Sequence, residues 1–169
     1  MSAQEKTFGM MPLAHAAFQG LETVVRLLVQ FQADVSAKED CGGTALYAAA
    51  VGGHAVVVEL LLGTGADAEA KDDEGRTALH DAARLGLEVV ARVLLGSGAD
   101  EQVKTNAGQT PEDLTTDQGH LQVAAVLKAE AVRRVQCVAF AMGHHVRLGD
   151  GSPVLELDAG VVRMVLEQV

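Results

Sequence analysis

The chain has 169 residues, enough for one domain of ordinary size, and its 13 Lys and Arg against 23 Asp and Glu give a formal net charge of −10. This charge repels phosphate backbones and anionic lipids, so we expect neither nucleic acid nor a membrane as a partner. Hydrophobic residues make up 49% of the chain, yet it has no Trp, one Tyr and four Phe. Apolar content that is mostly Ala, Val and Leu suits thin, closely packed helices.

The two cysteines, Cys41 and Cys137, lie far apart in the sequence, so we expect a reducing compartment rather than a disulfide framework. The opening residues, MSAQEKTFGM, lack the apolar core of a signal peptide. The richest apolar run, near the C-terminus, is interrupted by four charged residues and is not expected to span a bilayer. These features predict a cytoplasmic protein, or alternatively a nuclear one, and we expect a monomer.

A period of 33 residues organises the sequence. Threonine recurs at this interval, with methionine in the same position one period earlier, and glycine recurs in two further columns. The columns are Met11, Thr44, Thr77 and Thr110; Gly9, Gly42, Gly75 and Gly108; and Gly20, Gly53, Gly86 and Gly119. So many positions in phase over four periods indicate a repeat architecture.

The third period shows what each repeat is expected to build. Thr77 is a good helix N-cap, and Leu79 and two alanines then form a narrow apolar stripe on a short helix that Gly86 ends. A second helix, with Val90 on its apolar face, closes at Gly98. Helix pairs this short cannot bury their apolar faces alone, so they must stack on one another.

The recurring motifs closely resemble the ankyrin repeat family. In chain order they read GMMPLAHAA with FQADVSA, GGTALYAAA with GTGAD, GRTALHDAA with GSGAD, and GQTPEDLTT, a polar variant typical of a terminal repeat. The resemblance covers about residues 7–130 and implies an all-α solenoid of helix-turn-helix units with hairpin-like loops. The expected organisation is an N-terminal tail (1–6), repeats at about 9–41, 42–74, 75–107 and 108–130, and a helical C-terminal extension (131–169).

The first and last periods depart from the family pattern. Met11 and Ala14 replace the Thr and His of the first period, so the N-cap hydrogen bond is lost there. Gln32 replaces the glycine after the first outer helix, where it is expected to strain or fray the helix end. Ala131 replaces the corresponding glycine of the fourth period, so the last outer helix is expected to run on toward Gly143.

The candidates for chemistry have structural explanations. The family resemblance implies that His80 hydrogen-bonds the capping Thr77. Asp81 follows His80 directly, and adjacent helical residues do not face each other, so no catalytic His–Asp dyad is expected. Tyr47 occupies the histidine position of the second period, which a catalytic role does not explain. We therefore predict no catalytic residue and no enzyme.

No cofactor or metal site is expected either. Cys137, His144 and His145 supply at most three ligands, whereas a structural zinc site requires four. The segment from Asp150 to Ser152 lacks the later carboxylates of a calcium loop and is predicted to be a turn. Cys41 is expected to be an ordinary exposed thiol at a hairpin tip.

In ankyrin proteins, partners dock on a concave face built from hairpin tips and inner helices. Mapping that face by register gives the predicted partner-binding residues Phe18, Lys38, Asp40, Val51, Lys71, Asp73, Glu74, Arg76, Arg84, Leu85, Asn106 and Gln109. Within this set, Phe18, Val51 and Leu85 are expected to form an apolar ladder flanked by Arg76 and Arg84. The alternative is that they are scattered apolar surface residues.

Beyond the repeats, Asp158 is expected to cap a final helix with an apolar side that includes Val161, Val165 and Leu166. One interpretation is that this helix covers the end of the solenoid. The other follows from the similarity of SPVLELDAGVVRMVLEQV to the first helix of F-box or SOCS-box segments.

Two functional hypotheses follow. The first is a non-enzymatic scaffold that binds a protein on the concave face. The second is an adaptor or inhibitor, either because the C-terminal helix recruits a second partner such as a ubiquitin-ligase subunit, or because the chain is similar to small four-ankyrin kinase inhibitors. An enzyme would require a catalytic site in the extension, where His144 and His145 are the candidates.

Overall fold

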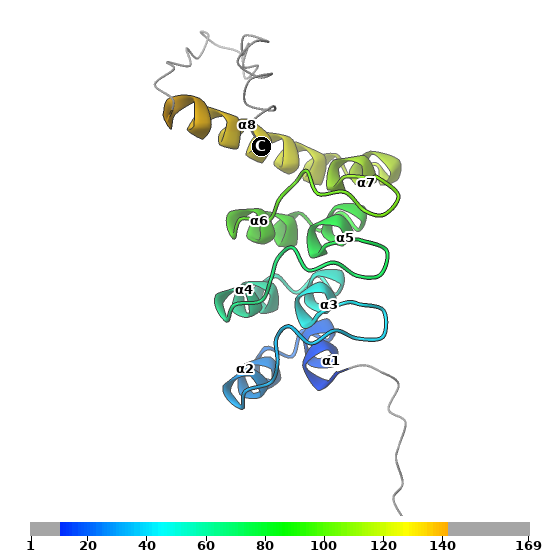
Figure 1. The fold of residues 1–169 in the computed structure, drawn as a ribbon, viewed down its shortest axis with the longest axis vertical. Coiled ribbons are helices and arrows are strands. Elements are labelled where there is room, and N and C mark those ends of the chain that lie inside the picture. Colours follow the sequence, from blue (N-terminus) through cyan, green and yellow to red (C-terminus); the bar gives the residue numbers. More distant parts are fainter. Residues whose placement is uncertain (1–10, 142–169) are drawn as a thin grey trace, which may run out of the picture. The chain divides into compact units, whose positions relative to one another are not determined.

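A computed structural model describes residues 11–141, except for the side chains at positions 116–118 and 135–141. The regular elements of this part of the chain are all helices, without strands, and consecutive helices form pairs that longer loops connect (Figure 1). The helices are α1 (Pro12–Phe18), α2 (Glu22–Gln30), α3 (Ala45–Val51), α4 (Ala55–Gly63), α5 (Ala78–Arg84), α6 (Glu88–Gly96), α7 (Pro111–Gln118) and α8 (Leu121–Ala141). The predicted all-α solenoid is confirmed.

The repeats stack through two rows of helices. In the inner row α1 contacts α3, α3 contacts α5, and α5 contacts α7; in the outer row α2 contacts α4 and α4 contacts α6. Alanines allow the close approach of the inner helices, and Ala17, Ala50 and Ala83 are completely buried at equivalent positions. Branched aliphatic residues such as Val58 and Leu61 form the buried side of the outer helices.

The helix starts follow the residue in the capping position. Thr44 accepts a hydrogen bond from the backbone N–H of Tyr47 at 3.3 Å, as a helix N-cap does. Met11 stands in the same position before α1 and has no side-chain acceptor to offer. In the fourth repeat, the carboxylate of Asp113 accepts hydrogen bonds from the N–H and hydroxyl of Thr110, both at 2.8 Å. The predicted loss of the cap in the first repeat is therefore confirmed.

The two departures at the ends of outer helices also have visible consequences. Gln32 has a φ of +64°, in the left-handed region that the equivalent Gly65 and Gly98 occupy without a Cβ. α8, which has no such glycine, continues for 21 residues to Ala141. The expectation that the last outer helix runs past residue 131 is confirmed.

The chain divides into two compact units between Val126 and Leu127, within α8. The site described below belongs to the first unit. The tail at 1–6, His144, His145, the turn from Asp150 to Ser152 and the helix expected from Asp158 lie outside the described residues, as does the side chain of Cys137.

Candidate protein-binding face

Three hairpins project from the inner side of the stack, and they are built alike (Figure 1). The N–H of the first hairpin residue donates to the carbonyl of the fifth in each: Glu39 to Gly43 at 2.8 Å, Asp72 to Arg76 at 3.0 Å, and Thr105 to Gln109 at 3.0 Å. We call these tips (39–43, 72–76 and 105–109), with the adjoining inner-helix residues, the hairpin face.

Backbone hydrogen bonds join each tip to the next. The N–H of Asp73 donates to the carbonyl of Cys41 at 3.1 Å, and that of Asn106 donates to the carbonyl of Glu74 at 3.0 Å. The side-chain amide of Asn106 also donates to the carbonyl of Asp73 at 3.0 Å. The tips are thus held in fixed positions relative to one another.

A row of lysines ties the hairpins together at their bases. The ammonium of Lys38 donates to the carbonyl of Lys71 at 2.8 Å, and the ammonium of Lys71 donates to the carbonyl of Lys104 at 3.2 Å. Both donors are exposed residues that the sequence assigned to partner binding. Their bonds give them a role in joining successive repeats, which the sequence analysis did not anticipate.

The carboxylate of Asp72 stabilises the second hairpin by accepting hydrogen bonds from other residues of the same hairpin. One carboxylate oxygen accepts the N–H groups of Glu74 and Arg76 at 2.9 and 2.8 Å, and the other accepts the Arg76 guanidinium at 2.9 Å. Burial by itself would raise the pKa of Asp72, but the hydrogen bonds from Arg76 outweigh it and lower that pKa. Arg76 also reaches Glu74 at 3.2 Å, so its guanidinium is held between two carboxylates.

Asp81 is the centre of a second network. Its carboxylate is completely buried, and it accepts hydrogen bonds from the Tyr47 hydroxyl of the preceding repeat and from Arg84 Nε, the latter at 2.7 Å. Arg76 lies 3.7 Å from the same carboxylate. Burial raises the pKa of Tyr47, and the bond to Asp81 raises it further. A buried acid is thereby shared by two repeats.

His80 has different hydrogen-bond partners from Asp81, and it stabilises the start of α5. Its Nδ1 accepts the N–H of Thr77 at 3.1 Å, and its Nε2 lies 3.2 Å from the carbonyl of Gln109 in the next repeat. The ring is completely buried, and this burial lowers the pKa of His80. The predicted structural role with Thr77 is confirmed, and Asp81 has other hydrogen-bond partners than His80.

A pocket of about 390 Å³ opens between the second and third hairpin tips. Six predicted partner-binding residues line it: Asp73, Glu74, Arg76, Arg84, Asn106 and Gln109. Thr105, Ala107 and Leu114 complete the wall. The guanidinium groups of both arginines are held in fixed orientations at the pocket wall. Asp72 pairs with Arg76, and Asp81 pairs with Arg84.

The other predicted residues lie elsewhere. Lys38 and Lys71 line a separate hollow of about 400 Å³ at the bases of the first two hairpins. Phe18 and Val51 are the last residues of α1 and α3 and do not line either hollow. Asp40 is exposed at the first tip.

The expected apolar ladder needs correction. Phe18, Val51 and Arg84 are the last residues of the three inner helices, so the third member of that column is charged. Leu85 is the C-cap after α5, in the column of Gln19 and Gly52. The predicted ladder placed Leu85 in the column of Phe18 and Val51, one residue beyond the true equivalent, Arg84. That column is therefore apolar in the first two repeats and charged in the third.

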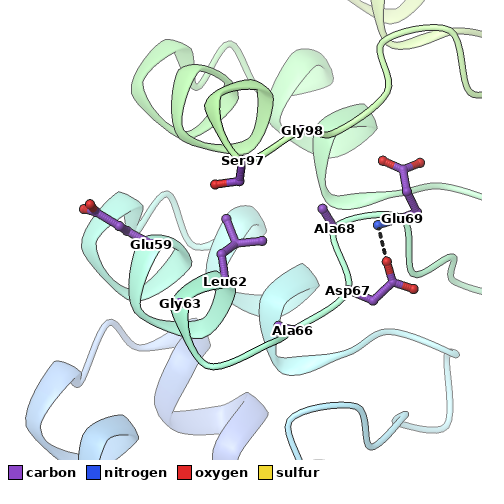
Figure 2. A pocket seen from close by; sticks show the side chains of 9 residues that line it. All are labelled: Glu59, Leu62, Gly63, Ala66, Asp67, Ala68, Glu69, Ser97 and Gly98. Atoms are coloured by element: carbon purple, nitrogen blue, oxygen red, sulfur yellow. Dashed lines mark hydrogen bonds between the residues drawn. The ribbon is translucent and has the colours of Figure 1, made fainter.

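A larger hollow of about 540 Å³ lies between α4, the loop that follows it and the end of α6 (Figure 2). Leu62 and Ser97 are among its lining residues. Two of its three carboxylates accept backbone hydrogen bonds: Asp67 accepts the N–H of Glu69 and Glu69 accepts the N–H of Asp100, both at 2.9 Å. These bonds shape the loop, and the sequence analysis gave this region no role.

Comparison with known families agrees with this architecture. A family model described as ankyrin repeats, in three copies, matches residues 13–105 and again residues 57–136. The chain belongs to the ankyrin repeat family. Ankyrin repeats are in general protein–protein interaction modules, and proteins built from them are typically non-enzymatic. No curated protein matches the sequence.

Two further observations concern the described residues alone. None of the helices between residues 11 and 141 is both long and apolar enough to cross a bilayer. Within the same range, no three His, Cys, Asp or Glu side chains lie close enough together to hold a metal ion.

Tyr47 and Asp81 are the functional residues that the sequence analysis missed. Asp81 was considered only as a neighbour of His80, and Tyr47 only as a histidine replacement. The repeat register held a usable signal, because Tyr47 and Asp81 are separated by one period plus one residue. That spacing places them on facing inner helices of adjacent repeats.

Proposed function

We propose that this protein is a non-enzymatic interaction scaffold that binds a segment of a protein partner on the hairpin face, in the pocket between the second and third tips. The observation that carries the proposal is the gathering of six register-predicted residues around one pocket. Complete burial of His80, whose Nδ1 accepts the N–H of Thr77, supports a structural role for this histidine rather than a catalytic one.

The rigidity of the face supports the same conclusion. Backbone bonds between tips, the lysine row and the Tyr47–Asp81 contact all connect one repeat to the next. A surface held in this way loses little conformational entropy when a partner docks, so more of the contact energy contributes to affinity.

The charges of the face favour a basic partner segment. Asp40, Asp73 and Glu74 are exposed at the tips, whereas Arg76 and Arg84 are already paired with carboxylates. An arginine or lysine of the partner can therefore meet an exposed carboxylate near the pocket without competing for a buried one. We place this interaction in the cytoplasm or the nucleus.

The test compares two charge reversals. Glu74→Lys alters the second tip, where the Glu74 side chain is 71% exposed, and Glu59→Lys makes the same change of charge on the exposed side of α4. Proteins captured from lysate by the wild type are identified by mass spectrometry, and the affinity of each is then measured for the three purified chains. We expect Glu74→Lys to weaken binding about tenfold or more and Glu59→Lys to leave it unchanged.

Equal binding by all three chains contradicts a site on the hairpin face. If a captured ubiquitin-ligase subunit is insensitive to Glu74→Lys but is lost on charge substitution of Val165 and Leu166, the adaptor hypothesis replaces the scaffold hypothesis for that partner.

A further inference from the structure

Helix α2 and its two flanking residues carry an exposed apolar stripe. Leu21, Val24, Leu27 and Phe31 are 48%, 41%, 48% and 79% exposed, and their spacing places them along one side of the helix. We call these four residues the α2 stripe. Among the described residues, the neighbours of α2 are α1 and α4, and the stripe is left uncovered by both.

The equivalent positions in later repeats show what part of this stripe does. Val57, Val90 and Val123 occupy the column of Val24 and are each 1% exposed, because the preceding repeat covers them. Val24 therefore presents a surface that elsewhere in this protein forms a contact between repeats.

Phe31 is not explained by its position in the repeat. Its column contains Thr64 and Ser97 in the next two repeats, so stacking does not require an apolar residue there. Phe31 is nevertheless the most exposed large hydrophobic residue among those described, and exposed aromatic residues often anchor interfaces.

The balance of charged residues around the stripe indicates which kind of partner can approach it. Glu22 and Arg26 are the only Asp, Glu, Lys or Arg residues between positions 11 and 32, and they pair with each other at 2.8 Å. The segment 11–32, which forms α1 and α2, is therefore neutral in a chain of net charge −10. It is therefore a surface that a second, equally acidic copy can approach without charge repulsion.

We propose that the α2 stripe packs against the α2 stripe of a second copy, around a twofold axis, with Phe31 as the anchor. A twofold interface uses the same patch on both subunits, and one apolar helix stripe can pack on its own copy in this way. Helix α2 lies in the outer row, whereas the hairpins extend from the inner row (Figure 1), so each subunit of this dimer keeps its hairpin face accessible. The proposed dimer has two binding faces, and it is the alternative to the monomer expected from the sequence.

The experiment is sedimentation velocity on the full chain from sub-micromolar to high-micromolar concentration. Phe31→Glu tests the stripe, and Val89→Glu is the matched control because Val89 is 64% exposed on α6, outside the stripe. Circular dichroism establishes that all three chains are folded. We expect the wild type and Val89→Glu to shift from one to two chains in mass as concentration rises. Phe31→Glu should weaken this dimer about tenfold or more.

A wild-type mass of one chain at every concentration overturns the proposal, whether residues 1–10 or a different protein cover the stripe. A dimer that Phe31→Glu and Val89→Glu weaken equally, or not at all, also overturns it by placing the interface elsewhere. Leu27→Glu provides a second variant of the stripe should Phe31→Glu fail to fold. None of these results depends on a partner for the hairpin face.

Discussion

The first and third repeats share one fold but differ in almost every feature that stabilises it. Before α5, Thr77 is bonded to a buried His80, whereas Met11 and Ala14 provide no such bond before α1. Gly98 ends the outer helix of the third repeat without strain, whereas Gln32 has a positive φ at the same point. The third repeat is the more strongly stabilised of the two, because its capping position and its helix-end position each hold the residue that the backbone conformation requires.

The apolar side chains of the third repeat are also more deeply buried than those of the first. Val90 in the third repeat is 1% exposed and the equivalent Val24 is 41% exposed. Stability in a repeat stack is approximately the sum of the repeats' own stabilities and of the contacts between neighbours. The first repeat therefore depends on its contact with the second, while the third contributes stability to both of its neighbours.

Removing the His80 ring is expected to have the largest effect. His80→Ala deletes the acceptor for Thr77, leaves the carbonyl of Gln109 without this partner and opens a cavity, so we expect a loss of about 3 kcal/mol in the free energy of unfolding. Urea denaturation followed by circular dichroism measures it. His80→Asn should recover part of the loss, because Asp113 shows that a short side chain can accept from the capping Thr. An unchanged stability of His80→Ala contradicts the capping argument.

The difference in burial predicts the next effect. Val90→Ala should lower the free energy of unfolding by about 2 kcal/mol, because it removes two methyl groups from a closed contact between repeats. At protein concentrations low enough for the monomer, Val24→Ala should cost about 0.5 kcal/mol, since its side chain is already half in solvent. Equal losses in urea denaturation would show that Val24 is covered in solution, as the proposed dimer requires at high protein concentration.

Exchanging the residues after the outer helices should make the two repeats more alike. Gln32→Gly should raise the free energy of unfolding by about 1 kcal/mol by removing left-handed strain, and Gly98→Gln should lower it by a similar amount. A Cβ at Gly98 meets no neighbouring atom within 4 Å, so the backbone conformation alone is tested there. Thermal denaturation measures both, and a stabilised Gly98→Gln contradicts the strain argument.

Protonation of His80 at acid pH should lower the free energy of unfolding by a smaller amount than the substitutions above. Burial lowers the pKa of His80 in the folded protein, so the unfolded chain binds this proton at higher pH than the native state does. Stability from this group is therefore complete above about pH 6.5 and is lost as the pH falls from there toward the native pKa. Urea denaturation between neutral pH and pH 5 should show this slope in the wild type and a smaller one in His80→Asn.

The sequence predicts the repeat stack well because each repeat is determined by local features. The threonine caps, the left-handed glycines and the alanine stripes each act within a few residues, and their 33-residue spacing identifies them. The overrun of α8 and the strain at Gln32 were predicted for the same reason, since each results from the absence of a single glycine.

The hairpin face was predicted less completely because its geometry arises between repeats. Six of the predicted residues meet around one pocket, but register alone does not show that Asp72 and Asp81 hold Arg76 and Arg84 in place. The lysines were assigned to partner binding because their register places them in the hairpins, whereas the structure directs their ammonium groups to backbone carbonyls. Such partners depend on the distance between repeats, which the sequence does not state.

The bond from Tyr47 to Asp81 has a consequence for how this protein can vary among species. Tyr47 lines neither of the hollows on the inner side of the stack, yet it holds the acid that orients Arg84. Tyr47→Phe would keep the ring but remove the hydroxyl donor from one oxygen of Asp81, so the carboxylate that orients Arg84 would be held less firmly. Under the proposed function, a change at Tyr47 alters binding from outside the pocket wall, so conservation at Tyr47 should follow that of Asp81 rather than that of the pocket wall.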